Sequence, residues 1–236
     1  RSHRKHTKPV HATEFLANPS LVASGSDDLV KYILTIDKEI DVKIFDVATN
    51  EVIRNFSDLH QDHIRALKVL SERENSLLVG SYDKTISLLD LRTLDQVSNL
   101  KHVENILETR QIFNHGFPVE SIAAFSDTYR FASVGGSSVN FCYILSTIQT
   151  FIWDLRSDKP VYSFLNNLKT ITSVKVNQAG TRLLTGSLDQ HLKIFDLENE
   201  GQVCHQFKFE AGIMSFDLTN DFSHMIIGMK FIQLLI

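Results

Sequence analysis

Cysteine is scarce in this sequence, and the hallmarks of secreted and membrane proteins are missing with it. Two cysteines, Cys142 and Cys204, cannot build a disulfide framework and favour a reducing compartment. No apolar run reaches the roughly 18 residues of a transmembrane helix, and no signal-peptide pattern opens the chain. The sequence therefore predicts a soluble intracellular protein.

Motifs that carry catalytic chemistry are also missing. Gly135-Gly136 lacks the following Lys and helix of a phosphate-binding loop, no Ser lies in a Gly-x-Ser-x-Gly elbow, and neither cysteine has a CxxC partner. His60 and His63 have a spacing that suits a metal only on a helix or with further ligands, whereas this segment is predicted to run from a loop into a strand. We expect no enzyme activity, cofactor, metal or small-molecule substrate.

Positive charge is not in excess. The chain has 24 Lys and Arg against 28 Asp and Glu, a net charge of −4, which gives no general reason to expect a nucleic-acid-binding surface. The basic run RSHRKHTK at residues 1–8 could contact phosphate, but a solvated chain end is the simpler interpretation. Apolar residues make up 43% and charged residues 22%, as in soluble globular domains.

What the sequence does contain is a repeat. Residues 183–197, LLTGSLDQHLKIFDL, alternate apolar and polar residues around a Gly-Ser-x-Asp turn, a pattern that predicts strand, turn and strand. Related copies occur at residues 23–47, 78–91 and 131–155. Such a signature at a spacing of about 40 residues is typical of a β-propeller.

These repeats resemble the WD-repeat (WD40) family, with Trp153-Asp154 as the literal Trp-Asp pair. We predict an all-β fold of four blades and a partial fifth, from the seven-bladed ring that the resemblance implies. The expected blades span approximately residues 6–56, 57–101, 115–165, 166–207 and 208–229. In the second blade, QVSNL at residues 96–100 is the expected fourth strand. Because the resemblance implies seven blades, we expect missing blades before Arg1 and after Met229.

Family propellers contain a buried hydrogen-bond network of a loop His, a strand Ser or Thr, a turn Asp and a Trp. No repeat of this chain holds all four groups: Val79 and Leu89 replace the hydroxyl and the indole in the second, while Ala132 and Gly136 occupy the hydroxyl and Asp positions of the third. Catalytic roles are the alternative for these His and Asp residues, but we favour the structural one. The residues that match the network are His6, Ser24, Asp28, His60, Asp83, His115, Trp153, Thr185 and Asp189. The fourth repeat has Asn167 in place of His, and Phe45 and Phe195 stand in the Trp positions of the first and fourth.

Three segments exceed the repeat length, at residues 30–40, 103–111 and 139–149. The first and third add the same surplus of eleven residues to the same turn, and both are rich in Ile, Leu, Tyr and Phe, which is unusual for exposed turns. All three begin with Val and two end with Gln, residues whose codons can carry the terminal letters of an intron. Genuine loop insertions and translated short introns therefore both stay open, and sequencing the transcript distinguishes them.

The resemblance extends to one group within the family. HTKPVHATEF, NHGFPVESIAAF, GTRLLTGSLDQHLKIF and EAGIMSFDL are similar, in this order, to repeats of WD-repeat subunits of the UtpA complex in the small-subunit processome. That resemblance implies a nucleolar, and so nuclear, scaffold that supports pre-ribosomal RNA transcription and maturation of the 18S RNA. It implies processome subunits as protein partners, indirect association with U3 small nucleolar RNA or pre-ribosomal RNA, and no membrane.

A second binding function stays open beside this one. The chain could instead be a peptide-binding WD-repeat adaptor, such as a substrate receptor for ubiquitin transfer. A central pocket lined by carboxylates and aromatic side chains would favour that adaptor, whereas co-purification with processome subunits would favour the scaffold.

Overall fold

The computed structural model of this chain describes its secondary structure at residues 10–15, 21–26, 42–46, 49, 51–56, 59–70, 73–91, 109–127, 129–136, 148–157, 159–219, 224–230 and 234–235. The chain divides into two compact units, Arg1–Gly116 and Phe117–Ile236. Within the described residues every regular element is a β-strand. The strands are β1 (Val10–Phe15), β2 (Leu21–Ser26), β3 (Val42–Asp46), β4 (Glu51–Phe56), β5 (Ile64–Leu70), β6 (Arg73–Ser81), β7 (Thr85–Asp90), β8 (Thr109–Asn114), β9 (Val119–Ala124), β10 (Arg130–Gly135), β11 (Ile148–Asp154), β12 (Pro160–Asn167), β13 (Ile171–Val176), β14 (Arg182–Ser187), β15 (His191–Asp196), β16 (Gln202–Lys208), β17 (Ile213–Leu218), β18 (Met225–Met229) and β19 (Leu234–Leu235).

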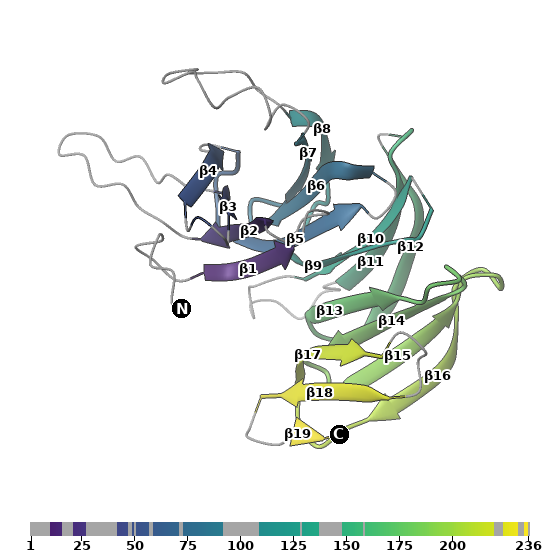
Figure 1. Cartoon of the computed structure of the whole chain (residues 1–236). Helices are drawn as coiled ribbons and strands as arrows, with labels where there is room; N and C mark the ends of the chain where they lie inside the picture. Colours follow the sequence, from purple (N-terminus) through teal and green to yellow (C-terminus); the bar gives the residue numbers. More distant parts are fainter. Residues whose placement is uncertain are drawn as a thin grey trace. The chain divides into compact units, whose positions relative to one another are not determined.

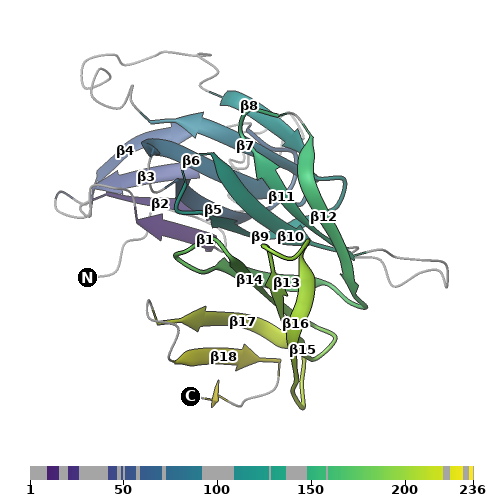
Figure 2. The same ribbon diagram turned by 90° about the vertical axis from the view of Figure 1, so that its right-hand side faces the viewer.

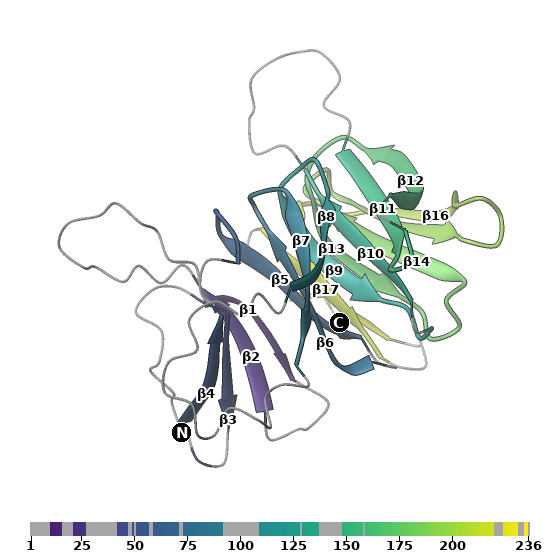
Figure 3. The ribbon, with the colours of Figure 1, turned by 90° about the horizontal axis from the view of Figure 1, so that it is seen from above.

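The first unit holds two four-stranded antiparallel sheets whose strands follow the chain order, β1-β2-β3-β4 and β5-β6-β7-β8 (Figures 1 and 3). The first strands of the two sheets, β1 and β5, lie next to each other. Side chains of both sheets share one apolar core, in which Ile44, Ile64 and Leu77 are fully buried. Beside this core the Nζ atom of Lys68 lies 2.6 Å from Oε1 of Glu14, so an ion pair also joins β5 to β1.

The second unit holds the sheets β9-β10-β11-β12, β13-β14-β15-β16 and β17-β18-β19, again in chain order (Figure 2). Phe125, Val174 and Phe195 belong to the core between the first two of these sheets. At the next junction the hydroxyl of Thr172 donates to the carbonyl of Ile213 at 2.8 Å, which ties β13 to β17. Apolar packing and polar contacts therefore both join neighbouring sheets within the unit.

A bulge recurs at the start of the first strand of every sheet. In the fourth sheet, for example, Ile171 pairs with Ser187, and Ser173 pairs with Gly186, so one residue of β13 is skipped. The same irregularity occurs in β1, β5, β9 and β17. Because a bulge bends a strand and increases its twist, we expect the first strand of each sheet to bend at the same place.

The predicted all-β architecture of four four-stranded sheets and a partial fifth is confirmed in the described residues. No helix among them is long and apolar enough to cross a membrane. One strand assignment was wrong, since the fourth strand of the second sheet is β8, which pairs with β7 from Leu89↔Thr109 to Thr85↔Asn114. QVSNL, at residues 96–100, lies outside the described residues. The last three residues of the expected 103–111 insertion, Thr109 to Gln111, lie in this strand.

The pairing of the second and third strands of a sheet gives the number of residues in the connection between them, which contains the Gly-Ser-x-Asp turn. Gly80↔Ile86 and Gly186↔Leu192 leave five residues, 81–85 and 187–191, between the paired positions. Gly25↔Val42 leaves 26–41, and Val134↔Thr150 leaves 135–149, which are 16 and 15 residues. The surplus is therefore eleven in the first repeat and ten in the third, one fewer than expected. The insertion at 30–40 and residues 139–147 of the other lie outside the described residues, as do residues 103–108.

Candidate functional site

The second repeat carries the most complete polar network around a predicted pair. Nδ1 of His60, in the loop before β5, lies 2.8 Å from Oδ2 of Asp83 and 3.1 Å from the Thr85 hydroxyl. That hydroxyl donates to Oδ1 of Asp83 at 2.6 Å, and the backbone N–H of Gln61 donates to Oδ2 at 2.9 Å. Ser81 joins the network by donating to the carbonyl of Asp62 at 2.7 Å. The turn between β6 and β7 is thus bound to the loop before β5.

The Asp83 carboxylate is stabilised in its charged form. Burial by itself would raise its pKa, but the hydrogen bonds from His60 and Thr85, the charge of His60 and the Gln61 N–H together lower the pKa to about 2. The side chain of His60 is fully buried and that of Asp83 is 12% exposed. Nε2 of His60 is buried without a hydrogen-bond partner among the described atoms. Val79, fully buried, occupies the strand position where other repeats carry a hydroxyl.

The third repeat contains the other two groups of the network, the Trp and the strand hydroxyl. Nε1 of Trp153 donates to the Ser133 hydroxyl at 2.8 Å, and both residues are buried. Phe131 pairs with Trp153 just as Leu183 pairs with Phe195 in the fourth repeat, so Ser133 corresponds to Thr185. The expectation that Ala132 occupies the hydroxyl position was wrong by one residue. By the same alignment, residue 137 corresponds to Asp189, the turn Asp of the fourth repeat, whereas Gly136 was expected there. The third repeat therefore has ten extra residues after this turn position, and not the expected eleven.

In the fourth repeat, the Asp189 carboxylate accepts hydrogen bonds from backbone N–H groups. Oδ2 of Asp189 accepts from the N–H of Leu168 at 3.0 Å, and Oδ1 accepts from the N–H of His191 at 3.0 Å. Ser187 donates to the carbonyl of Lys169 at 3.0 Å, repeating the role of Ser81. The Thr185 hydroxyl is buried without a hydrogen-bond partner among the described atoms, and Phe195 beside it offers no indole N–H.

The remaining predicted residues are placed only in part. The Ser24 hydroxyl, 5% exposed, donates to the carbonyl of Lys43 at 3.5 Å. His115 is buried, and its backbone N–H donates to the carbonyl of Lys84 at 2.8 Å within the first unit. His6 and Asp28 lie outside the described residues. The structure therefore brings His60 together with Asp83, whereas Trp153 meets Ser133, which the sequence reasoning missed.

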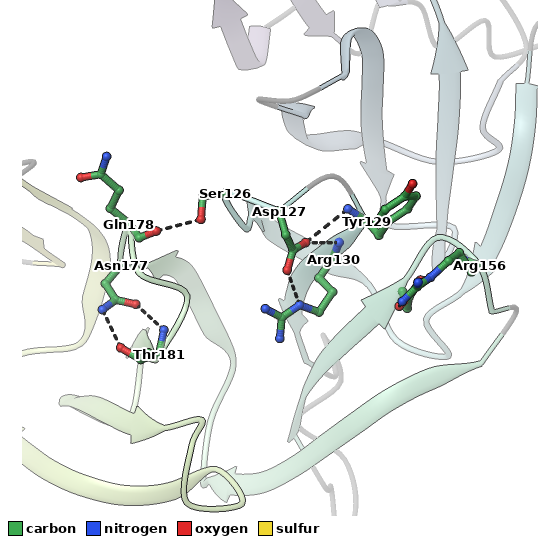
Figure 4. A network of polar contacts seen from close by, with 9 residues as sticks. Ser126, Asp127, Tyr129, Arg130, Arg156, Asn177, Gln178 and Thr181 are labelled. Carbon is green, nitrogen blue, oxygen red and sulfur yellow. Dashed lines mark hydrogen bonds and ion pairs between the residues drawn. The ribbon is translucent and has the colours of Figure 1, made fainter.

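A second polar cluster lies where β11 ends, close to the loop between β9 and β10 (Figure 4). The Asp154 carboxylate accepts three bonds from Arg156: from its backbone N–H at 2.9 Å, from Nε at 2.8 Å and from Nη2 at 2.5 Å. The guanidinium stands over the Tyr129 ring, with Cζ 4.8 Å from the centroid. Nearby, Nε of Arg130 donates to Asp127 at 2.5 Å, and its guanidinium covers the Phe125 ring at 4.6 Å.

This cluster keeps Asp154 charged. The hydrogen bond from the Arg156 side chain is the largest cause and outweighs burial, and the charge of Arg130 contributes as well, so the pKa falls to about 2. The Arg156 pKa rises, chiefly because of the Asp154 hydrogen bond. The Asp-x-Arg spacing was visible in the sequence, but its stacking on Tyr129 depends on a loop 25 or more residues earlier in the chain.

Neither cluster has the composition of a metal centre. Within the described ranges, no group of three or more His, Cys, Asp or Glu side chains could hold a metal ion. His60 and Asp83 are hydrogen-bonded to each other, to the Thr85 hydroxyl and to the backbone N–H of Gln61. The hydrogen bonds of His60 Nδ1 and of the Asp83 carboxylate therefore stay within this repeat.

Comparison with known proteins agrees with the repeated sheets. The family described as WD domain, G-beta repeat matches residues 158–196, which include the last strand of the third sheet and the first three of the fourth. Residues 158–196 are therefore similar to a WD repeat, the class of repeat that the sheets also indicate.

Within that class, the chain is similar to proteins named U3 small nucleolar RNA-associated protein 15. It is 30% identical to the Xenopus laevis homolog over 225 residues, 95% of this chain and 36% of the relative. It is also 30% identical to the Schizosaccharomyces pombe protein, covering 85% of this chain and 44% of the relative. Identity to the Saccharomyces cerevisiae protein is 26%, over 89% of this chain and 35% of the relative. The chain thus spans less than half the length of these relatives.

Proposed function

We propose that this chain is part of a non-catalytic WD-repeat scaffold in ribosome biogenesis. In this role its sheets present loops and edges to other protein subunits of the UtpA complex and the small-subunit processome. The scaffold would act in the nucleolus, where it supports pre-ribosomal RNA transcription and maturation of the 18S RNA. Its association with U3 small nucleolar RNA or pre-ribosomal RNA would be indirect, through those subunits.

The similarity to U3 small nucleolar RNA-associated protein 15 is the observation that carries this proposal. It extends over 95% of the chain, well beyond the one repeat that the family match covers. Gly-Ser-x-Asp turns are common to WD repeats of many functions, so a similarity confined to them would support only the fold. Similarity across both units, including relatives from frog and two yeasts, supports the more specific role.

The geometry supports the non-catalytic part of the proposal. A general base must reach a substrate proton, yet the side chain of His60 is fully buried and its Nδ1 is engaged by Asp83 and Thr85. The Trp153–Ser133 pair is equally enclosed. Both pairs support the rigidity of the sheets, and a rigid frame with variable loops is suited to partner binding.

Depletion of the full-length protein in its own cells tests the role. We expect pulse-labelled 18S RNA to fall while large-subunit RNA is maintained, and a tagged full-length protein to purify with processome subunits from nucleoli. Re-expression of the intact protein should restore 18S RNA. Normal 18S labelling after depletion, or purification with ubiquitin-ligase subunits in place of processome subunits, would overturn the proposal and favour the adaptor.

A further inference from the structure

We propose that two copies of this chain pair through β12, antiparallel about a two-fold axis at Ser163. β12 is the outermost strand of the sheet β9-β10-β11-β12, and within the described residues no strand pairs with its outer edge (Figure 2). Pairing of two such edges would join two four-stranded sheets into one continuous sheet. The proposal does not depend on the role in ribosome biogenesis, because its evidence lies within the sheets.

β12 lacks the charges that protect the other outer strands. A free strand edge carries N–H and C=O groups that can pair with another chain, and charged side chains normally prevent this. β12 has no charged residue from Val161 to Asn167. Each of the other outer strands has at least one: Glu51 and Arg54 in β4, Arg110 in β8, and Lys208 in β16. The outer edge of β12 is therefore the least protected of these four.

An exposed aromatic ring lies at the end of a row of stacked rings on this strand. Phe195 of β15 stacks on Phe164 with centroids 5.6 Å apart, and Phe164 stacks on Tyr162 at 6.4 Å with ring planes 4° apart. Phe164 is only 8% exposed, whereas Tyr162 is 54% and Val161 is 48% exposed. A second strand would cover this ring and this aliphatic side chain, which adds apolar contact to the backbone hydrogen bonds.

The sequence of β12 is chemically symmetric about Ser163, which points to a second copy as the occupant. The segment VYSFL contains, in order, an aliphatic residue, an aromatic, Ser, an aromatic and an aliphatic residue. In antiparallel pairing centred on Ser163, Tyr162 would lie opposite Phe164 of the second copy. Val161 would likewise lie opposite Leu165. Matched cross-strand pairs stabilise a sheet, and a two-fold contact requires a self-complementary surface of this kind.

The other outer strands lack this symmetry. All four outer strands skip one residue in their pairing with the third strand of the sheet, and the skipped residues align them: Ile53 in β4, Arg110 in β8, Val161 in β12 and Cys204 in β16. The same two-fold pairing in the other three would set a polar residue opposite a phenylalanine: Arg54 and Phe56, Gln111 and Phe113, and His205 and Phe207. Among these four strands, like therefore meets like in β12 alone.

Sedimentation velocity of the full chain over a range of concentrations tests the pairing. We expect a reversible equilibrium between monomer and dimer. Ser163→Lys would place two like charges opposite each other at the axis and should weaken the dimer about fivefold, and Ser163→Glu should do the same. An equal mixture of these two variants should restore the dimer, since opposite charges then face each other. Gln206→Lys, at the corresponding exposed position of β16, is the matched control and should leave the equilibrium unchanged.

Recovery in the mixture also guards against misfolding as an explanation, because only folded chains can pair. A monomer at every concentration, no recovery in the mixture, or an equal loss in Gln206→Lys would overturn the proposal. A monomer that binds a labelled peptide of alternating Val and Thr, with binding lost in Ser163→Lys, would overturn it in favour of a strand from another protein. Because the readout is self-association, failure here leaves the 18S RNA test unaffected.

Discussion

The ring of Phe164 occupies the space that a Cβ atom on residue 201 would fill, so the third and fourth sheets meet against a glycine. Phe164 lies in β12 and also stacks on Phe195 of β15, with centroids 5.6 Å apart. Gly201 lies in the turn before β16, where its N–H donates to the carbonyl of Asp196 at 2.8 Å and its φ is +69°. Two independent constraints, one from the turn and one from packing, therefore require glycine here.

Gly201→Ala should destabilise the second unit by about 2–4 kcal/mol, because the methyl group overpacks Phe164 and the left-handed backbone disfavours a side chain. Urea unfolding gives the measurement. Gly180→Ala is the matched control, since its φ is +68° but its nearest neighbour, Cδ1 of Phe125, is at an ordinary 3.4 Å. We expect only about 1 kcal/mol there. Equal losses in the two variants would show that Phe164 does not clash.

The Trp153–Ser133 bond should be measurable by a double-mutant cycle. Trp153→Phe and Ser133→Ala each remove one partner from a buried pair, and we expect each to cost about 1–3 kcal/mol. The double variant should cost less than the sum, with a coupling of about 1 kcal/mol. Ala132→Ser serves as the control for the neighbouring position. Strict additivity would mean that the indole and the hydroxyl do not interact.

Acid should weaken the first unit through Asp83. Its pKa is about 2 in the folded protein against 3.8 for a free side chain, so the charged form stabilises the fold above pH 4. That stability is lost as the pH falls from about 4 towards 2, and amounts to about 2 kcal/mol. Unfolding free energies across this range should slope less in Asp83→Asn. Asp154 also has a pKa of about 2, so the slope will not vanish. An unchanged slope would contradict the assignment.

Val79→Thr should stabilise the second sheet. The substitution keeps the shape of a fully buried side chain and adds a hydroxyl at the position that holds Ser133 and Thr185 in other repeats. If that hydroxyl reaches Nε2 of His60, a buried nitrogen gains a partner, worth about 1 kcal/mol. Thermal unfolding measures the change in stability. Val69→Thr, at a less buried position, is the control that shows whether any Val-to-Thr change in this sheet has the same effect. A loss of stability would mean that the hydroxyl points elsewhere.

Much of the architecture could be predicted from the sequence because each repeat carries its own turn signal. The Gly-Ser-x-Asp turn and the alternation in HLKIFD fix where β14 ends and β15 begins, and both act over a few residues. The pairing of His60 with Asp83 was expected from the resemblance to WD repeats, and the structure brings the two side chains together. QVSNL was misassigned because a long connection separates β7 from β8, and alternation alone does not reveal which of two candidate strands joins the sheet edge.

Local patterns by themselves determined most of the strands and turns, with the fourth strand of the second sheet and the polar positions of the third repeat as the exceptions. Tertiary structure decided which groups meet: Trp153 with Ser133 instead of Ala132, Arg156 with Tyr129, and Phe164 with Gly201. The reason is physical, since a one-residue slip in register moves a side chain to the opposite face of the sheet. Contacts between sheets depend on close packing among residues far apart in the chain, which repeat spacing does not encode.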